Sequence, residues 1–194
     1  MPDQPKVLCF SGSLRTKSWN HKLVEVAAGA AEAAGAKVTV LRLRDYSMPI
    51  YDGDFEDKHG LPPHARALKG LFKEHHGFLI ATPEYNGSIS AALKNTIDWL
   101  SRREGDEPPL SAFSKKIAGL MSTSPGRLGG LRGLTPLRVI LAGIGTFVLP
   151  HQVAIPGCVE AFGDDGQLAD PQQQGAIELL ATEVVVAAKR LLLV

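Results

Sequence analysis

Short apolar runs rich in β-branched residues alternate along the chain with longer segments whose apolar residues recur at helical spacing. The apolar runs predict five strands, at residues 6–10, 37–43, 77–81, 116–121 and 146–149. The most regular helical stripe closes the chain and consists of Ile177, Leu180, Ala181, Val184, Ala188 and Leu191. Such alternation is typical of βαβ units around a mainly parallel sheet. The pattern therefore predicts a three-layer, doubly wound α/β fold.

Polar residues that stand just before the helical segments predict where the helices begin. Ser18 is expected to cap the first helix and Ser88 the helix after the third strand. Asp170 is expected to cap the last helix, with Pro171 in its first turn.

Two stretches are harder to assign. The polar segment 46–60 is expected to be a loop that leads to a helix over about 62–75. Pro136 lies within another helical pattern, where it would remove a backbone hydrogen bond. That helix either starts near residue 129 and bends, or starts at residue 136 with the proline in its first turn.

Composition narrows the class of protein. The chain has 194 residues, of which 44% are hydrophobic and 21% charged, so we expect a single domain over residues 1–194. A net charge of +1 without a basic tract argues against a nucleic-acid partner. The apolar run near the start is too short for a secretory signal, and the stretch 139–150 is too short to span a membrane. We therefore expect a cytoplasmic protein without a membrane contact.

Few residues offer metal or thiol chemistry. Cys9 and Cys158 lie far apart and give neither a disulfide framework nor metal spacing. His75 and His76 end a helix without a further ligand at suitable spacing. We expect them to be a surface pair and predict no metal site.

The first candidate binding segment, "SGSLRTKSWN" at 11–20, follows a predicted strand and opens a helix. Ligands of open parallel sheets bind beyond the carboxyl ends of the strands, and a helix N-terminus attracts anions. The neutral donors here are Ser11, Ser13, Ser18 and Asn20, and Arg15 adds a charged fork that suits a phosphate. The segment matches neither a Walker loop nor a G-x-G-x-x-G turn. A helix cap beside a solvated arginine is the alternative interpretation.

The second candidate segment, "TPEYNGS" at 82–88, follows the third strand. Pro83 restricts the backbone, Gly87 permits close approach of a ligand, and Tyr85 offers a flat apolar face. Successive N–H groups from Glu84 to Ser88 are suited to donate along one edge of a heterocycle. The alternative is a tight turn with a buried tyrosine.

The third segment, "STSPGRLGG" at 122–130, consists of small residues and glycines, so its backbone can approach the other edge of the heterocycle. Together the three segments favour a mononucleotide with a large planar base.

Two longer motifs resemble those of the NAD(P)H-dependent FMN reductases of flavodoxin-like fold, which include bacterial quinone, chromate and azo-dye reductases. They are "GSLRTKSWN" at 12–20 and "PEYNGSISAALKNTIDWLSR" at 83–102. Supporting matches are "MPIYDGD" at 48–54 and "GGLRGLTPLR" at 129–138, and the resemblance covers nearly the whole chain. It implies a five-stranded parallel sheet of order 2-1-3-4-5.

The resemblance also implies a cofactor, FMN, and the residues that bind it. The phosphate would be held by Ser11, Ser13, Arg15, Ser18 and Asn20. The isoalloxazine ring would be lined by Pro83, Glu84, Tyr85, Asn86 and Gly87, and approached on its pyrimidine side by Ser122, Thr123, Ser124 and Gly126. Family members form dimers or tetramers with the flavin near the interface, so a homodimer or homotetramer is expected, with Tyr51 and Asp52 contributing across the interface. The residues 125–127, "PGR", depart from the glycine pair expected there.

The implied activity is hydride transfer from NADPH or NADH through FMN to quinone, flavin, azo or metal-oxyanion acceptors, in a ping-pong scheme. The chemistry would belong to the cofactor, so no catalytic side chain is predicted, and Glu84 and Tyr85 would be positioning groups. The main alternative is a flavodoxin-type electron carrier without substrate turnover. Such carriers tend to be acidic, whereas this chain is nearly neutral. A flavin-free interaction module on the same sheet is a third alternative, because fold does not imply function.

Overall fold

The computed structural model describes residues 4–192 and contains a parallel sheet. Its strands are β1 (Lys6–Ser11), β2 (Lys37–Arg42), β3 (Gly77–Ala81), β4 (Ile117–Thr123) and β5 (Phe147–Ile155). They lie in the order β2-β1-β3-β4-β5, and each neighbouring pair is parallel. The order reverses direction between β1 and β3, which is the position where doubly wound sheets open a crevice for a ligand. The predicted fold and strand order are confirmed.

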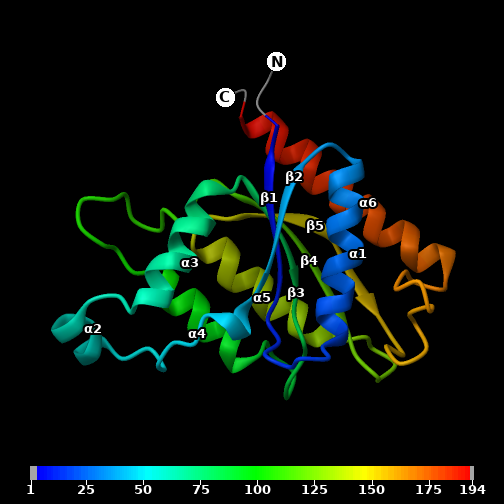
Figure 1. Cartoon of the computed structure of the whole chain (residues 1–194), viewed down its shortest axis with the longest axis horizontal. Helices are drawn as coiled ribbons and strands as arrows, with labels where there is room; N and C mark the ends of the chain where they lie inside the picture. Colours follow the sequence, from blue (N-terminus) through cyan, green and yellow to red (C-terminus); the bar gives the residue numbers. More distant parts are fainter. Residues whose placement is uncertain (1–3, 193–194) are drawn as a thin grey trace.

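Helices cover both faces of the sheet (Figure 1). One face carries α1 (Trp19–Ala33) and α6 (Pro171–Leu191). The other carries α3 (Pro63–Glu74), α4 (Ala91–Leu100) and α5 (Leu131–Gly143). A short helix, α2 (Gly53–His59), projects from the second layer and buries none of its residues. Within residues 4–192, no helix is long and apolar enough to cross a membrane.

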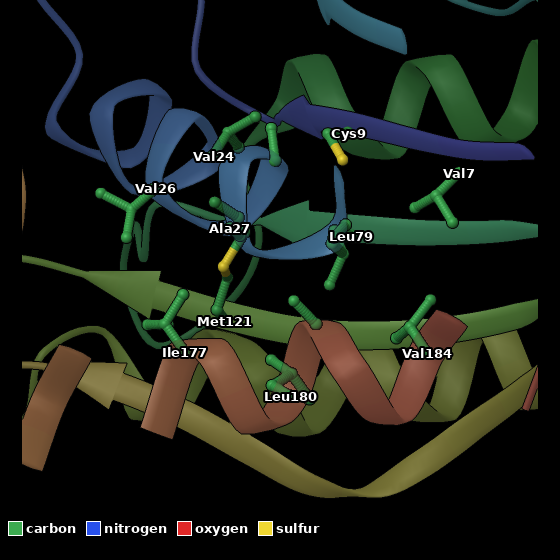
Figure 2. Close-up of a cluster of buried hydrophobic side chains, with 14 of the residues drawn as sticks. Val7, Cys9, Val24, Val26, Ala27, Leu79, Met121, Ile177, Leu180 and Val184 are labelled. Atoms are coloured by element: carbon green, nitrogen blue, oxygen red, sulfur yellow. The ribbon is translucent and has the colours of Figure 1, made fainter. Parts of the chain in front are cut away.

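Alternating side chains of the strands divide the core into two halves, because successive residues of a strand point to opposite faces. Val7 and Cys9 of β1 pack toward α1 and α6, whereas Leu8 and Phe10 pack toward α3 and α4. Figure 2 shows the first half, where Leu79 and Met121 lie between the two helices. Burial raises the pKa of the Cys9 thiol far above its usual range, so this cysteine is a neutral core residue.

The helix caps agree with the sequence prediction at two places and differ at a third. Ser18 caps α1 and Asp170 caps α6, as predicted. The cap of α4 is Ser90, whose Oγ accepts the N–H of Leu93 at 3.1 Å. The prediction of Ser88 was wrong because the backbone of Ser88 closes a tight turn with Tyr85, which delays the helix by two residues.

Several element boundaries also differ from the sequence prediction. The helix around Pro136 begins at Leu131, so the alternative with an early start is confirmed, and the proline lies within α5. The segment 46–60 was expected to be a loop but contains α2, which Asp52 caps through the N–H groups of Asp54 and Phe55. Strand β5 is longer than predicted and runs on through Ile155.

His75 is buried and is not part of a surface pair, so that prediction was wrong. Its Nδ1 lies 2.6 Å from the carbonyl oxygen of Leu71 and its Nε2 lies 2.9 Å from Oγ1 of Thr39. Burial lowers the pKa of the ring, so we treat it as neutral at pH 7. In the described part of the chain, no group of three or more His, Cys, Asp or Glu side chains is placed to hold a metal ion.

The long connection between α4 and β4 is fastened to α3 by ion pairs. Glu107 pairs with the buried Lys69 and, at 3.0 Å, with Lys73. Glu107 also accepts the N–H of Glu104 at 2.9 Å. Burial alone would raise the pKa of the Glu107 carboxyl, but the hydrogen bonds from the two lysines and this N–H lower it to about 2.

This shift predicts acid sensitivity of the folded state. The folded pKa is depressed from 4.5 to about 2, so the stabilisation is complete above 4.5 and is lost as the pH falls toward 2. We expect the free energy of unfolding of the Glu107→Gln variant to fall less between about pH 6 and about pH 3 than that of the wild type. Urea unfolding at both pH values measures this difference. Parallel pH profiles of the two proteins would contradict the prediction.

Candidate flavin site

A cleft of about 340 Å³ lies at the carboxyl edge of the sheet, where the connections after β1, β3 and β4 meet. It is lined by Ser13, Arg15, Ser18, Trp19, Asn20, Pro83, Glu84, Tyr85, Thr123, Ser124, Pro125 and Cys158. The three segments singled out in the sequence therefore converge on one cleft.

One end of the cleft is the N-terminus of α1. The Oγ of Ser18 accepts the N–H of His21 at 3.2 Å, which satisfies one of the free donors of the first turn. The N–H groups of Trp19 and Asn20 make no hydrogen bond to protein in the described residues. Arg15, which is exposed, lines the same end. Free helix donors beside a guanidinium group form a site for an anion such as a phosphate.

Serine side chains set the path of the loop between β1 and α1. The Oγ of Ser11 accepts the N–H of Ser13 at 3.1 Å, and the Oγ of Ser13 accepts the N–H of Arg15 at 3.3 Å. Ser11 is buried behind the loop and does not line the cleft, whereas Ser13 does. The structure thus gives Ser11 a role in shaping the loop.

Gly12 lets this loop lie directly against the start of α4. Its carbonyl oxygen accepts the hydroxyl of Ser90 at 2.5 Å. A Cβ at this position would lie 3.0 Å from Cβ and from Cδ2 of Leu93. No larger residue fits without moving the loop or the helix.

We therefore expect Gly12→Ala to lower the free energy of unfolding by about 1 kcal/mol, at the low end for overpacking. The displaced loop should also weaken FMN binding. Urea unfolding of the apoprotein and a fluorescence titration with FMN measure the two effects. Gly29→Ala is the control, because a Cβ at Gly29 meets no atom within 4 Å. Equal behaviour of the two variants would refute this explanation of Gly12.

Asn20 joins the loop after β1 to the end of β4. Its Nδ2 donates to the carbonyl oxygen of Thr123 at 2.9 Å, and its Oδ1 accepts the N–H of Thr123 at 3.1 Å. Its side chain was expected to donate to a phosphate, but its Oδ1 and one hydrogen of its Nδ2 are already paired with Thr123. The backbone N–H of Asn20 and the second hydrogen of its Nδ2 are the donors that this residue can still offer to a ligand.

The residues that follow Glu84 form a tight turn. Tyr85 and Ser88 exchange backbone hydrogen bonds of 2.9 and 3.1 Å. Asn86 and Gly87 between them have φ values of 53° and 76°, the pattern of a type I′ turn. The side chain of Tyr85 is not buried in this turn, since 52% of the residue is exposed.

The turn limits which backbone groups can serve a ligand. The N–H groups of Tyr85 and Ser88 are used within it, whereas those of Glu84, Asn86 and Gly87 have no acceptor among the described residues. The predicted run of donors from Glu84 to Ser88 is therefore reduced to three.

The structure brings together nine of the predicted site residues. Those that do not line the cleft are Ser11, Asn86, Gly87, Ser122 and Gly126. Ser122 is buried at the end of β4 and donates to the carbonyl oxygen of Gly129 at 2.8 Å, so it supports the third loop from behind.

Three further residues line the cleft. Trp19 and Pro125 lie inside the segments 11–20 and 122–130. They were not predicted as site residues, because only polar residues and glycine were chosen there. Trp19 stacks on Phe162 with ring centroids 5.7 Å apart. Cys158 follows β5, and burial is the main cause that raises the pKa of its thiol. No local sequence signal marks Cys158, because only the fold brings it to the cleft.

The donors of the cleft fit FMN in kind. One end offers helix N–H groups and Arg15 to an anion, and three free N–H groups, that of Glu84 in the cleft and those of Asn86 and Gly87 beside it, suit carbonyl and ring-nitrogen acceptors. A doubly wound sheet of order 2-1-3-4-5 with such a cleft at its switch point defines the flavodoxin-like class.

Comparison with known proteins gives the family. Residues 5–160 match the family described as NADPH-dependent FMN reductase. The chain is 34% identical to an NAD(P)H-dependent FMN reductase of Pseudomonas aeruginosa over 180 residues, 92% of each chain. It is 30% identical to the quinone reductase of Escherichia coli over 184 residues, 95% of this chain and 94% of the other. The chain belongs to the NADPH-dependent FMN reductase family.

A solved structure supports this assignment. The flavoenzyme FerB, an NAD(P)H:acceptor oxidoreductase of Paracoccus denitrificans, superimposes with a TM-score of 0.80 at 28% identity, and the match covers 96% of this chain and 98% of FerB. The chain is therefore an NAD(P)H-dependent flavoenzyme of the FMN reductase and quinone reductase type, with FMN as its cofactor.

Proposed function

We propose that this chain, as a single FMN-binding domain, passes reducing equivalents from NADPH or NADH to quinone, flavin, azo or metal-oxyanion acceptors in a ping-pong scheme. Bound FMN supplies the hydride-accepting chemistry, so the protein has to bind, orient and stabilise. The observation that carries the proposal is the single cleft with free helix donors at one end and three free N–H groups of a tight turn beside it.

In this proposal the phosphate of FMN lies at the N-terminus of α1. Arg15, the hydroxyls of Ser13 and Ser18, and the N–H groups of Trp19 and Asn20 surround that end. Ser11 and the amide of Asn20 hold the loop in place from behind.

The ring of FMN is proposed to lie between the turn and the third loop. Pro83, Glu84, Tyr85, Asn86 and Gly87 offer one edge, mainly through backbone N–H groups. The other edge is approached by Ser122, Thr123, Ser124 and Gly126, of which Thr123 and Ser124 line the cleft. Backbone donors near the pyrimidine side would stabilise the negative charge that the ring gains on reduction, as an oxyanion hole does.

Binding of both substrates at one exposed face leads to ping-pong kinetics. Hydride transfer through FMN requires no side-chain acid or base. The carboxylate of Glu84, which lines the cleft, is paired with Arg132. Steady-state rates at several fixed quinone concentrations should give parallel double-reciprocal lines in NADPH. Intersecting lines would show that both substrates bind together and would overturn the scheme.

The visible spectrum separates this proposal from an electron carrier. The purified protein should be yellow and should bleach rapidly when NADPH is added without oxygen. A yellow protein that NADPH does not reduce would act as a carrier, and a protein that cannot be loaded with FMN would have another function.

We further propose a cytoplasmic homodimer or homotetramer. Two buried free cysteines suit a reducing compartment. Ile50 is 86% exposed close to Tyr51 and Asp52, and such an exposed apolar residue suits a subunit contact. Within the chain, Tyr51 donates to Glu56 at 2.9 Å and Asp52 caps α2, so both also have internal partners. Light scattering after size-exclusion chromatography should give at least twice the monomer mass of 20.7 kDa.

A further inference from the structure

The carboxylate of Glu84 binds the first turn of α5. Its Oε2 accepts the N–H of Arg132 at 3.1 Å, and its Oε1 lies 2.7 Å from Nε of the Arg132 guanidinium group. The side chain of Glu84 is 9% exposed and that of Arg132 is 67% exposed. The carboxylate is therefore fixed between the turn and the helix, while the side chain of Arg132 stays mostly exposed to solvent.

Helix α5 has no capping side chain of its own. Its N-cap is Gly130, which has a φ of 86° and offers no side-chain acceptor. In the first turn, the N–H groups of Leu131 and Gly133 donate to backbone carbonyl oxygens, so the N–H of Arg132 is the one that needs an acceptor from elsewhere. Glu84, 48 positions earlier in the chain, provides it. A carboxylate at this place also interacts favourably with the positive end of the helix.

The backbones of the two segments approach each other closely at this contact. A Cβ at Gly133 would lie 3.4 Å from the carbonyl oxygen of Ser88 and 3.5 Å from Cα of Glu84. A Cβ at Gly130, the last residue of the loop 122–130, would lie 3.8 Å from Cβ of Glu84. The turn and the third loop thus meet without a side chain between them, and the Glu84–Arg132 pair bridges the join.

We infer that Glu84 and Arg132 are a positioning pair that sets the spacing between the turn 83–88 and the loop 122–130. The inference rests on FMN binding and on the placement of the ring between these segments. Among the described residues the carboxylate of Glu84 bonds to Arg132, whereas the phosphate end is formed by Arg15 and the N-terminus of α1. It therefore controls how the ring is held, and it adds Arg132 to the residues that matter for the cofactor.

The test compares Glu84→Ala, Glu84→Gln and Arg132→Ala with the wild type. Arg66→Ala is the matched control, since Arg66 forms an exposed ion pair with Glu104 away from the cleft. Two quantities are measured: the FMN dissociation constant, and the absorption spectrum of bound FMN at saturation. The second reports the surroundings of the ring and is insensitive to a role in folding alone.

We expect Glu84→Ala to raise the FMN dissociation constant about fivefold. This is the effect of losing the free energy of a typical helix cap from the FMN-bound protein alone. The absorption bands of bound FMN should shift as well. Glu84→Gln keeps an acceptor for the N–H of Arg132 and Arg132→Ala keeps the carboxylate, so both should show smaller changes in the same direction. Arg66→Ala should change neither quantity.

Two results would overturn the inference. One is a Glu84→Ala variant whose FMN spectrum and dissociation constant equal those of the wild type, even if the melting temperature of its apoprotein falls. If Glu84→Ala does not fold, the same result in both Glu84→Gln and Arg132→Ala would overturn it. The other is a higher dissociation constant with an unchanged spectrum, which would mean that the pair acts through the phosphate end. Failure of the proposed function is distinguishable, because all variants and the wild type would then bind no FMN.

Discussion

Replacement of Arg15 by alanine is expected to weaken FMN binding by about 1.5 to 3 kcal/mol, or about 10- to 140-fold in the dissociation constant. The reason is the loss of a charge-assisted hydrogen bond to the phosphate at the N-terminus of α1. Arg15 is exposed and its guanidinium group makes no hydrogen bond or ion pair within the described residues, so its removal leaves no buried group unsatisfied. The free energy of unfolding of the apoprotein should change by less than about 0.5 kcal/mol.

Lys17→Ala is the matched control for Arg15→Ala. Lys17 belongs to the same loop and carries the same charge, but it does not line the cleft. A fluorescence titration should show a much smaller loss of affinity in this variant. If the two variants lost affinity equally, the effect would come from net charge, and the placement of the phosphate beside Arg15 would be wrong.

Replacement of Glu107 by alanine is expected to lower the free energy of unfolding by about 3 kcal/mol while leaving FMN affinity unchanged. The cost arises because Lys69, whose side chain is only 4% exposed, would lose the partner of its buried charge. A carbonyl oxygen, that of Arg102, would still accept from Lys69, so we expect the low end of the range for broken buried pairs.

Arg66→Ala serves as the control for the Glu107 experiment. Its ion pair with Glu104 ties the same connection to α3, but both partners are exposed, and such pairs contribute at most about 1 kcal/mol. Urea unfolding at neutral pH compares the two variants. A loss in Glu107→Ala no larger than that in Arg66→Ala would mean that Lys69 finds solvent or another partner in the variant.

The strands could be predicted from the sequence because they contain apolar runs, whereas the extent of the edge strand β5 and the short helix α2 could not. Strand β5 continues through Pro150, His151 and Gln152, residues that interrupt an apolar run. It tolerates them because it lies at the edge of the sheet, where a proline need not donate. Helix α2 gives no amphipathic signal, since none of its residues is buried.

The candidate site could be predicted as three segments but not as a set of side-chain roles. Residue type marked Ser11 and Asn20 as side-chain donors to a ligand, yet both side chains are bonded to the protein backbone. Ser122 was expected to approach the ring with its loop, yet its hydroxyl donates to the carbonyl oxygen of Gly129. Cys158 could not be predicted as a site residue from the sequence, since its place at the cleft depends on the path of the chain after β5. Long-range pairing of this kind leaves no periodic trace in a single sequence.

The double hydrogen bond between Asn20 and the main chain of Thr123 has a consequence for the energetics of cofactor uptake. The side-chain amide of Asn20 pairs with both the N–H and the C=O of Thr123, as a neighbouring β-strand would, and so joins the first candidate segment to the third. The loops are thus held in register by the protein itself, and little conformational entropy remains to be lost when the cofactor enters. Reloading of stripped protein should accordingly resemble docking into a rigid receptor more than folding around a template.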